Sequence, residues 1–298
     1  MPTAPRQIIP GRAYLLTRCC SERRFFLKPS GLINAIVLYA LAYYASRHGI
    51  LVHGFCVLSN HYHLVATDVR GVLPDFLRDL NGVLARALNQ AHGRSDGFWE
   101  RESYSAVRLV DPEDMLRKLV YTLANPVQAG LISRASEWPG LWSDPDDIGG
   151  RPLMARRPEG FFDEEGDMPE KVELQLVPPP RFEGDPAFHE NLVQGLREAE
   201  AIATAKLKEE GRSFLGLAGI LSQSIYACPA QTPRFELNPR VACVRKWKRI
   251  ETLLRLKEFV QAYKEALAAW RNGVRDVLFP PGTWHMRVVH AACCASYG

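Results

Sequence analysis

Two histidines and a tyrosine–asparagine pair are the residues of this chain whose types and spacing could do chemistry. His61 and His63 flank one residue, and on a β-strand their side chains would project from the same face because side chains alternate with period two. Tyr121 and Asn125 stand four residues apart, so on a helix they would share a face, one turn above the other. Two imidazole nitrogens, an amide oxygen and a phenol suit metal-assisted attack of a tyrosine on a phosphodiester.

Each of these residues also has a simpler explanation. A lone His-x-His pair on a strand is weak evidence for a metal, helical tyrosines usually pack in a core, and Asn125 before Pro126 could simply end a helix. The combination is what favours a site. Neutral imidazole binds divalent transition ions, and an amide oxygen also suits Mg²⁺ and Mn²⁺. Three protein ligands would leave positions open for phosphate oxygens and water, as a catalytic site requires.

The first part of the chain alternates strand patterns with helix patterns, which is the arrangement that would position these residues. Strands are expected at four places: 13–19, 51–58, 61–67 and 104–110. Helices are expected at three: 29–48, from Pro74 onward, and from Asp111 to about Asn125. The order β-α-β-β-α-β-α predicts an α+β fold, namely a ferredoxin-like antiparallel sheet with helices on one face plus one extra helix.

The rest of the chain differs in composition. Residues 143–186 are rich in proline, glycine and acidic residues, which is typical of a linker or of an extended arm packed on a surface. Residues 187–298 are predicted to be mainly helical, with Asn238 capping a long helix that starts at Pro239. The predicted division is a catalytic domain at 8–142, the linker or arm, and a helical C-terminal domain with an accessory role in DNA binding.

The bulk properties are those of a soluble globular protein. Of 298 residues, 47% are hydrophobic and 23% are charged, and the net charge of +4 favours a polyanionic partner without proving one. The most apolar stretch, 32–45, is too short to span a bilayer, and the first residues lack a secretory signal. Seven cysteines without a Cys-x-x-Cys pair indicate neither a disulfide framework nor a zinc ribbon. We therefore expect a cytoplasmic protein without a membrane partner.

Two segments resemble a known family. Phe-Cys-Val-Leu-Ser-Asn-His-Tyr-His-Leu-Val at 55–65 and Tyr-Thr-Leu-Ala-Asn-Pro-Val-Gln-Ala-Gly-Leu at 121–131 resemble the HUH-superfamily single-tyrosine transposases, above all the REP-associated tyrosine transposases of bacteria. The likeness covers roughly the first half of the chain. It implies an HUH catalytic domain in which His61, His63 and Asn125 hold Mg²⁺ or Mn²⁺. Tyr121 would then attack single-stranded DNA, which leaves a 5′-phosphotyrosine link and a free 3′-hydroxyl.

Cationic and aromatic side chains in the chain could bind such a strand, because guanidinium groups make forked contacts with phosphate and rings stack on bases. Commoner alternatives are solvated charge and core packing, and for the basic start of the last long helix a solvated face is the favoured interpretation. The candidate DNA-binding residues are Arg18, Arg23, Arg24, Arg101, Arg108, Trp99, Lys246, Lys248 and Arg249, with Tyr62, Phe98 and Tyr104 as further stacking candidates.

The leading functional prediction is metal-dependent cleavage and rejoining of single-stranded DNA, as in a transposase or nicking endonuclease, with a DNA hairpin as a further ligand. The alternative is a catalytically inactive, sequence- or hairpin-specific nucleic-acid-binding protein of the same fold. A two-histidine phosphodiesterase is less favoured because the chain has no second His-x-Ser/Thr motif. The sequence leaves open the DNA sequence, the metal used, and whether the chain acts as a monomer or as a homodimer with its site in cis or in trans.

Overall fold

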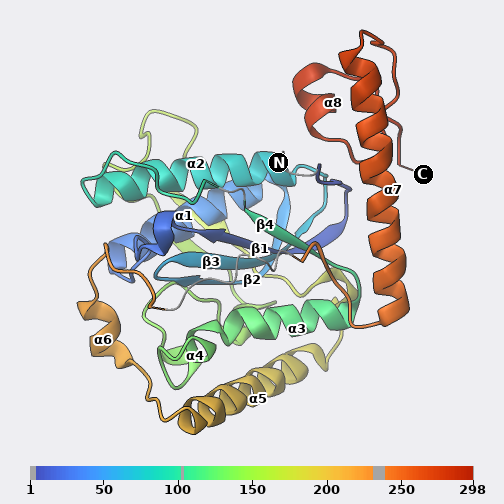
Figure 1. The fold of residues 1–298 in the computed structure, drawn as a ribbon. Coiled ribbons are helices and arrows are strands. Elements are labelled where there is room, and N and C mark those ends of the chain that lie inside the picture. The colour runs from blue at the N-terminus through green and yellow to red at the C-terminus, as the bar shows by residue number, and fades with distance from the viewer. Residues whose placement is uncertain (1–4, 102–103, 231–238, 298) are drawn as a thin grey trace.

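A five-stranded sheet of order β2-β3-β1-β4-β7 forms the centre of the structure (Figure 1). The structure is a computed structural model that describes residues 5–101, 104–230 and 239–297. The strands are β1 (Arg12–Cys19), β2 (Ile50–Leu58), β3 (His61–Asp68), β4 (Ser105–Leu109) and β7 (Val241–Ala242). The first four pair antiparallel, whereas β7 runs parallel to β4. The four predicted strands and their ferredoxin-like order are confirmed.

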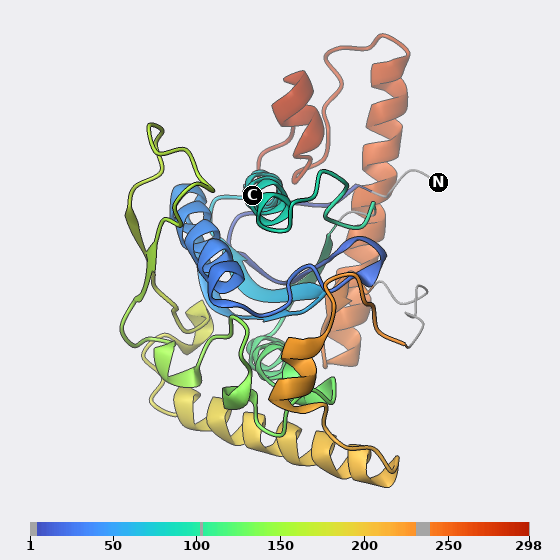
Figure 2. The same cartoon turned by 90° about the vertical axis from the view of Figure 1, so that its left-hand side faces the viewer.

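Helices cover both faces of this sheet. α1 (Gly31–His48) and α2 (Leu73–Ala91) lie side by side on one face, as the predicted α+β fold requires (Figures 1 and 2). The extra helix, α3 (Pro112–Leu123), lies on the opposite face with the short α4 (Asn125–Gln128). Within the described ranges, single turns of 3₁₀ helix occur at Ser21–Arg23, Ala135–Glu137, Pro145–Asp147 and Pro180–Phe182.

Alternation along β3 separates the residues of the His-Tyr-His segment. The hydroxyl of Tyr62 donates to Asn81 Oδ1 of α2 at 2.9 Å, so this ring points toward the α1/α2 face. His63 instead meets the ring of Tyr121 on α3, which places the two histidines on the opposite face. The core between these layers is apolar and fully buried, with Leu16, Phe55 and Leu64 among its members.

Residues 143–186 form an arm that packs against α1. Within the arm, β5 (Leu153–Arg156) and β6 (Lys171–Leu174) pair as a separate two-stranded sheet. The hydroxyl of Tyr39 on α1 donates to Pro169 O at 2.5 Å, and the Tyr39 ring lies 4.8 Å from that of Phe162. These short strands were not predicted, because four residues show too little alternation to stand out in an acidic segment.

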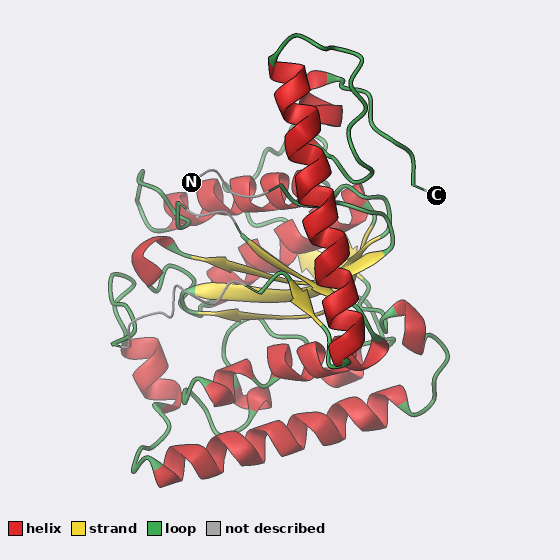
Figure 3. Cartoon of the chain, turned by 45° about the vertical axis from the view of Figure 1, so that its right-hand side comes forward, coloured by secondary structure: helices red, strands yellow, loops and turns green. Residues whose placement is uncertain are grey.

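The helices after residue 186 pack in two places. α5 (Phe188–Glu209) and α6 (Gly216–Ser222) join the main core, and α5 packs along α3. α7 (Lys246–Arg271) instead runs past the β7 edge of the sheet (Figure 3). Its side chains form a second small core with those of α8 (His285–His290). The predicted domain division stays a prediction.

The predicted start of the long helix is wrong. Arg108 N donates to Arg240 O and Val110 N to Ala242 O, so this segment is extended and pairs with β4 before α7 begins at Lys246. Asn238, the predicted cap, lies outside the described residues. In the part of the chain that the structure describes, no helix combines the length and apolarity that a membrane crossing requires.

Candidate catalytic site

The imidazoles of His61 and His63 converge at one end of the sheet. β3 is flanked by β1 and β2, so His63 is held between Thr17 and Cys56. The two Nε2 atoms lie 3.1 Å apart, and the rings are nearly perpendicular at a centroid distance of 4.7 Å. Two ligands placed ~2.1 Å from one ion at a right angle to each other would be about 3.0 Å apart. The pair therefore fits two adjacent positions around one ion.

The other nitrogen of each ring has its own partner. Asn60 Oδ1 lies 2.6 Å from His61 Nδ1, and Thr17 Oγ1 lies 2.8 Å from His63 Nδ1. When each Nδ1–H donates to these oxygens, both Nε2 lone pairs are left facing the common point. Such partners fix the tautomer and orientation of metal-ligating histidines.

Both imidazoles are held in the neutral form, which is the form that binds a metal. Burial lowers the pKa of His61 to about 4, and the charge of Arg23 acts in the same direction. Burial also lowers the pKa of His63 well below its usual value, with further contributions from His61 and Lys118.

Tyr121 lies beside the histidines on the last turns of α3. Its ring centroid is 5.4 Å from that of His63, and the two rings meet edge to face. The helix starts with a capping box formed by Asp111 and Asp114, and Trp142 Nε1 donates to Leu123 O at 3.0 Å at its other end. Tyr121 is 36% exposed, which leaves it accessible to a large substrate.

Asn125 is buried directly after α3 and hydrogen-bonds the hydroxyl of Tyr121. Burial raises the pKa of Tyr121, and the Asn125 hydrogen bond opposes that rise because it favours the phenolate. The structure thus brings four predicted residues together: the His61–His63 pair contacts Tyr121, and Tyr121 is bonded to Asn125.

Three residues of this cluster were not predicted from the sequence. Lys118 Nζ lies 5.2 Å from the ring centroid of Tyr121, and the i, i+3 spacing on one helix could have identified it. Asn60 directly precedes His61, so its position in the sequence could also have identified it. Thr17 contacts His63 only through strand pairing, which no local pattern reveals.

A strained loop lies next to His61. Glu22 and Arg23 both have positive φ, 52° and 54°, a conformation that side chains other than glycine rarely adopt. Backbone hydrogen bonds from Ser21 N to Phe98 O and from Arg24 N to Ser21 O hold the loop in place. Arg23 Nε lies 3.8 Å from Glu100 Oε1, close enough to His61 for its charge to act on that ring.

The other predicted DNA-binding residues near this end of the sheet do not form one cluster, and each has its own surroundings. Arg24 bonds Glu22 and the carbonyl of Tyr226, and Arg101 is exposed. Arg18 donates to Glu100 O at 2.9 Å and lies 5.8 Å from the ring centroid of Trp99. Trp99 is half-buried and donates to Asn81 O of α2, so it belongs to the opposite face from the histidines.

Two stacking predictions are wrong. Tyr62 is 5% exposed and Phe98 is 2% exposed, so neither ring can stack on a base. Both fill the core beside α2, and their rings each meet Trp99 edge to face. The half-buried Tyr104 carries the guanidinium of Arg6 at 4.0 Å above its ring.

The remaining predicted cations lie away from the histidines. Arg108 stands opposite Tyr14, at the other end of β4 from Ser105, which pairs with Thr17. At the start of α7, Lys248 is bonded to the buried Asp111, and Arg249 lies 3.5 Å from Cys243 O. Lys246 is exposed with its Nζ 5.7 Å from the Trp247 ring.

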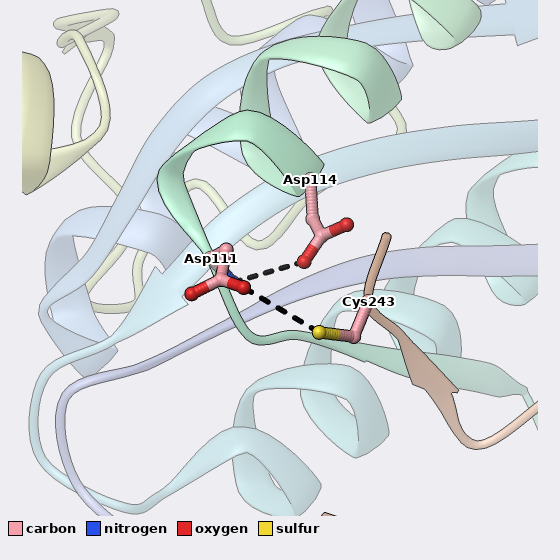
Figure 4. A group of neighbouring side chains, drawn as sticks. All are labelled: Asp111, Asp114 and Cys243. Carbon is pink, nitrogen blue, oxygen red and sulfur yellow. Dashed lines mark hydrogen bonds between the residues drawn. The ribbon is translucent and has the colours of Figure 1, made fainter. Parts of the chain in front are cut away.

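Asp111, Asp114 and Cys243 form a second group of side chains with metal-ligating atoms (Figure 4). Their ligand atoms lie within 4.8 Å of one another, and all three residues are buried. Protein donors already occupy them: Cys243 Sγ donates to Asp111 Oδ2 at 3.4 Å, and Asp114 accepts from the N–H groups of Asp111 and Val244. Lys248 and Arg245 also pair with Asp111, so the charge of this group is already compensated.

No protein-family model and no curated protein matches the chain. Several solved structures are similar to it, among them the following two. One is a REP-associated tyrosine transposase bound to a REP hairpin, at 18% identity over 57% of this chain and 94% of that one, with a TM-score of 0.42. The other is a candidate transposase from Deinococcus radiodurans R1, at 20% identity over 35% of this chain and 84% of that one, with a TM-score of 0.28.

Proposed function

We propose that the chain is a metal-dependent DNA transposase or single-strand endonuclease that cleaves and rejoins single-stranded DNA through Tyr121. The observation that carries the proposal is the convergence of two neutral imidazoles beside a tyrosine whose hydroxyl is bonded to Asn125. The resemblance of segments 55–65 and 121–131 to the single-tyrosine transposases supports the same assignment.

The donor set fits a divalent ion. His61 and His63 would offer their Nε2 atoms and Asn125 its amide oxygen, a mixed nitrogen and oxygen set that accepts Mn²⁺ or Mg²⁺. When bound, the ion would polarise the scissile phosphate and neutralise developing charge. Asn60 and Thr17 would keep both histidines in the tautomer that this requires.

Tyr121 would act as the nucleophile. Its phenolic oxygen forms a bond to phosphorus while the bond from phosphorus to the 3′-oxygen breaks. The phenolic proton leaves to solvent, and the departing 3′-oxygen takes up a proton from solvent. The product is a 5′-phosphotyrosine and a free 3′-hydroxyl. Because one phosphate ester replaces another, attack by a 3′-hydroxyl on the phosphotyrosine rejoins the strand and releases Tyr121. The Asn125 hydrogen bond and the nearby Lys118 ammonium favour the phenolate.

The partner we propose is single-stranded DNA, with a hairpin as an additional element to test. The alternative is a nucleic-acid-binding protein of the same fold without catalysis, which would retain DNA binding but form no covalent product. The homodimer and the site in trans stay predictions.

A covalent adduct tests the proposal. The full chain is incubated with a 3′-labelled pool of single strands and hairpins plus Mn²⁺, and label on the protein is read on a denaturing gel. We expect an adduct that EDTA and Tyr121→Phe abolish, whereas Tyr43→Phe on the opposite face of the sheet leaves it unchanged. Binding of the pool without any adduct would favour the non-catalytic alternative, and an adduct that persists in Tyr121→Phe would exclude this nucleophile.

A further inference from the structure

Three arginines from distant parts of the chain meet at the end of the sheet away from the histidines. Arg12 begins β1, Arg108 lies on β4, and Arg240 directly precedes β7. All three line a cavity of about 50 Å³, with Tyr14 and Thr252 also in its wall. At roughly one probe sphere of volume per water, it has room for a few water molecules or one small anion.

This arginine cavity is separate from the candidate catalytic site. Arg12 pairs with Asp68 at one end of the β1/β3 ladder, and Cys19 pairs with His61 at the other. At ~3.3 Å per residue these ends are on the order of 20 Å apart. Arg12, Tyr14 and Arg108 also lie on the α1/α2 face, whereas the histidines face α3, because Thr17 and Tyr14 differ by an odd number of residues.

Carboxylates of the described residues do not compensate the charges of three arginines in this cavity. Among the described residues, none of Arg12, Arg108 and Arg240 forms an ion pair, and Arg12 instead bonds Gln7 Oε1 at 3.0 Å. The nearby Asp68 is buried and accepts from the N–H groups of residues 71, 72 and 73, so it is occupied elsewhere.

Burial and a neighbouring cation lower the pKa of each of these guanidinium groups. Burial lowers the pKa of Arg12 to about 10, and the charge of Arg108 adds to the effect. Burial lowers the pKa of Arg108 with a contribution from Arg255, and that of Arg240 with a contribution from Arg6. Groups of like charge that lie close together and are half-buried destabilise a fold unless an anion neutralises them.

An aromatic cleft adjoins the arginine cavity. It has a volume of about 600 Å³ and shares Arg6 and Ile8 with the cavity. Tyr104, Tyr263 and Trp284 line it, so it joins the sheet region to α7 and to the segment before α8. Aromatic rings beside cations accept the flat ring of a base, and the forked arginine donors match a phosphate.

We propose that Arg12, Arg108 and Arg240 bind the phosphate group of a nucleotide unit whose base enters the aromatic cleft. The unit is either a free nucleotide or one residue of a nucleic-acid strand. The C-terminal segment then has a defined role, since Arg240, Tyr263 and Trp284 complete a site that the sheet alone lacks.

Calorimetric binding to the full chain tests this proposal in a Tyr121→Phe background, where cleavage is excluded. The probes are inorganic phosphate, thymidine 5′-monophosphate and a single-stranded oligonucleotide, which separate free from strand-borne phosphate. We expect Arg108→Gln and Arg240→Gln to weaken binding of the bound probe about tenfold or more, as loss of a charged hydrogen bond does. Arg275→Gln removes an arginine that lines neither the cavity nor the cleft and should change nothing.

A thermal melt shows whether a variant that binds less is still folded. Without a ligand, Arg108→Gln should melt at the same or a higher temperature than its parent, because a repulsion is removed, and the stabilisation by the bound probe should be lost. Equal binding of every probe by parent and arginine variants, or no binding by the parent, would overturn the proposal. Neither result depends on cleavage, so the function proposed for Tyr121 would stand or fall separately.

Discussion

The Nε2 atoms of His61 and His63 lie 3.1 Å apart, while Asn60 and Thr17 hold the opposite nitrogens of the two rings. A hydrogen bond between the two rings and an ion shared by them would each account for this spacing, and the two differ in the tautomer that they require. Each ring has one nitrogen bound to the protein and one directed at a shared point, which is the pattern of a metal-ligating pair.

Thr17→Val tests that pattern. The substitution keeps the shape of the side chain but removes the hydroxyl that holds His63 Nδ1, so we expect the affinity for Mn²⁺ to fall about tenfold or more, as losses of such partners do. Calorimetric titration of the metal measures it. Thr17→Ser keeps the hydroxyl and should bind as the parent does, and unchanged affinity in Thr17→Val would show that this hydrogen bond does not support a ligand.

Lys118 should act on the nucleophile and not on the metal. Its ammonium lies 5.2 Å from the Tyr121 ring centroid, where it would stabilise the negative charge of the phenolate as it attacks. Stabilisation of the transition state by ~0.5–1 kcal/mol corresponds to a few-fold change in rate. We expect Lys118→Gln to slow adduct formation about two- to fivefold in single-turnover measurements with saturating Mn²⁺, and Lys118→Arg to restore most of the rate. Because His63 is neutral at pH 7 with or without this lysine, Mn²⁺ affinity should stay the same. A rate loss explained wholly by weaker metal binding would contradict this role.

His53 predicts how stability depends on pH. It is fully buried, bonds Val177 O and Thr67 Oγ1, and burial lowers its pKa to about 4. In the unfolded chain the pKa is ~6.5, so the unfolded state takes up a proton first, and stability is present above pH ~6.5 and lost as the pH falls toward 4. At pH 5 the loss from His53 alone is about 2 kcal/mol.

Urea unfolding at pH 7 and pH 5 in EDTA measures this loss. Burial lowers the pKa of His61 and His63 as well, so the comparison with His53→Gln isolates one group. The variant starts from a lower stability but should lose about 2 kcal/mol less between the two pH values. Equal losses in both proteins would mean that His53 does not titrate as its burial predicts.

The metal should bind at the histidines and not at the Asp111 group. Asp111 is ionised, since its hydrogen bond with Lys248 lowers its pKa, and its partners are Lys248, Arg245 and Cys243. We therefore expect His61→Ala/His63→Ala to lose detectable binding of Mn²⁺ and Zn²⁺. An ion that remains bound in this double variant and disappears with Cys243→Ser would assign a metal site to the second group instead.

The sequence predicted the part of the fold whose segments carry their own periodicity. The strands around His61 and the helix that carries Tyr121 are long enough for alternation, caps and prolines to mark them. β7 escaped prediction because two residues show no period, and they pair only because β4 offers an open edge. The predicted start of α7 was wrong for a related reason. The Asn238-Pro239 pair is a local signal for a helix start, whereas pairing with β4 keeps the residues after Pro239 extended.

The candidate site, too, was predictable only where its residues are close in sequence. His61 with His63, and Tyr121 with Asn125, are neighbours in sequence, so spacing alone placed each pair on one face. That the two pairs meet depends on α3 crossing the sheet at this point, which is a tertiary relationship. Arg108 was predicted to bind DNA together with Arg18, Arg23, Arg24 and Arg101, and the structure places it with Arg12 and Arg240.

Identification of the attached residue tests the central claim most directly. Trypsin cleaves after Lys118 and Arg134, and the peptide 119–134 contains Tyr121 as its single tyrosine. After incubation with the DNA pool and Mn²⁺, nuclease and trypsin digestion, and mass spectrometry, the account predicts a nucleotide attached through phosphate to Tyr121 in that peptide. A nucleotide found on another residue, or a cleaved strand with no modified peptide, would contradict it.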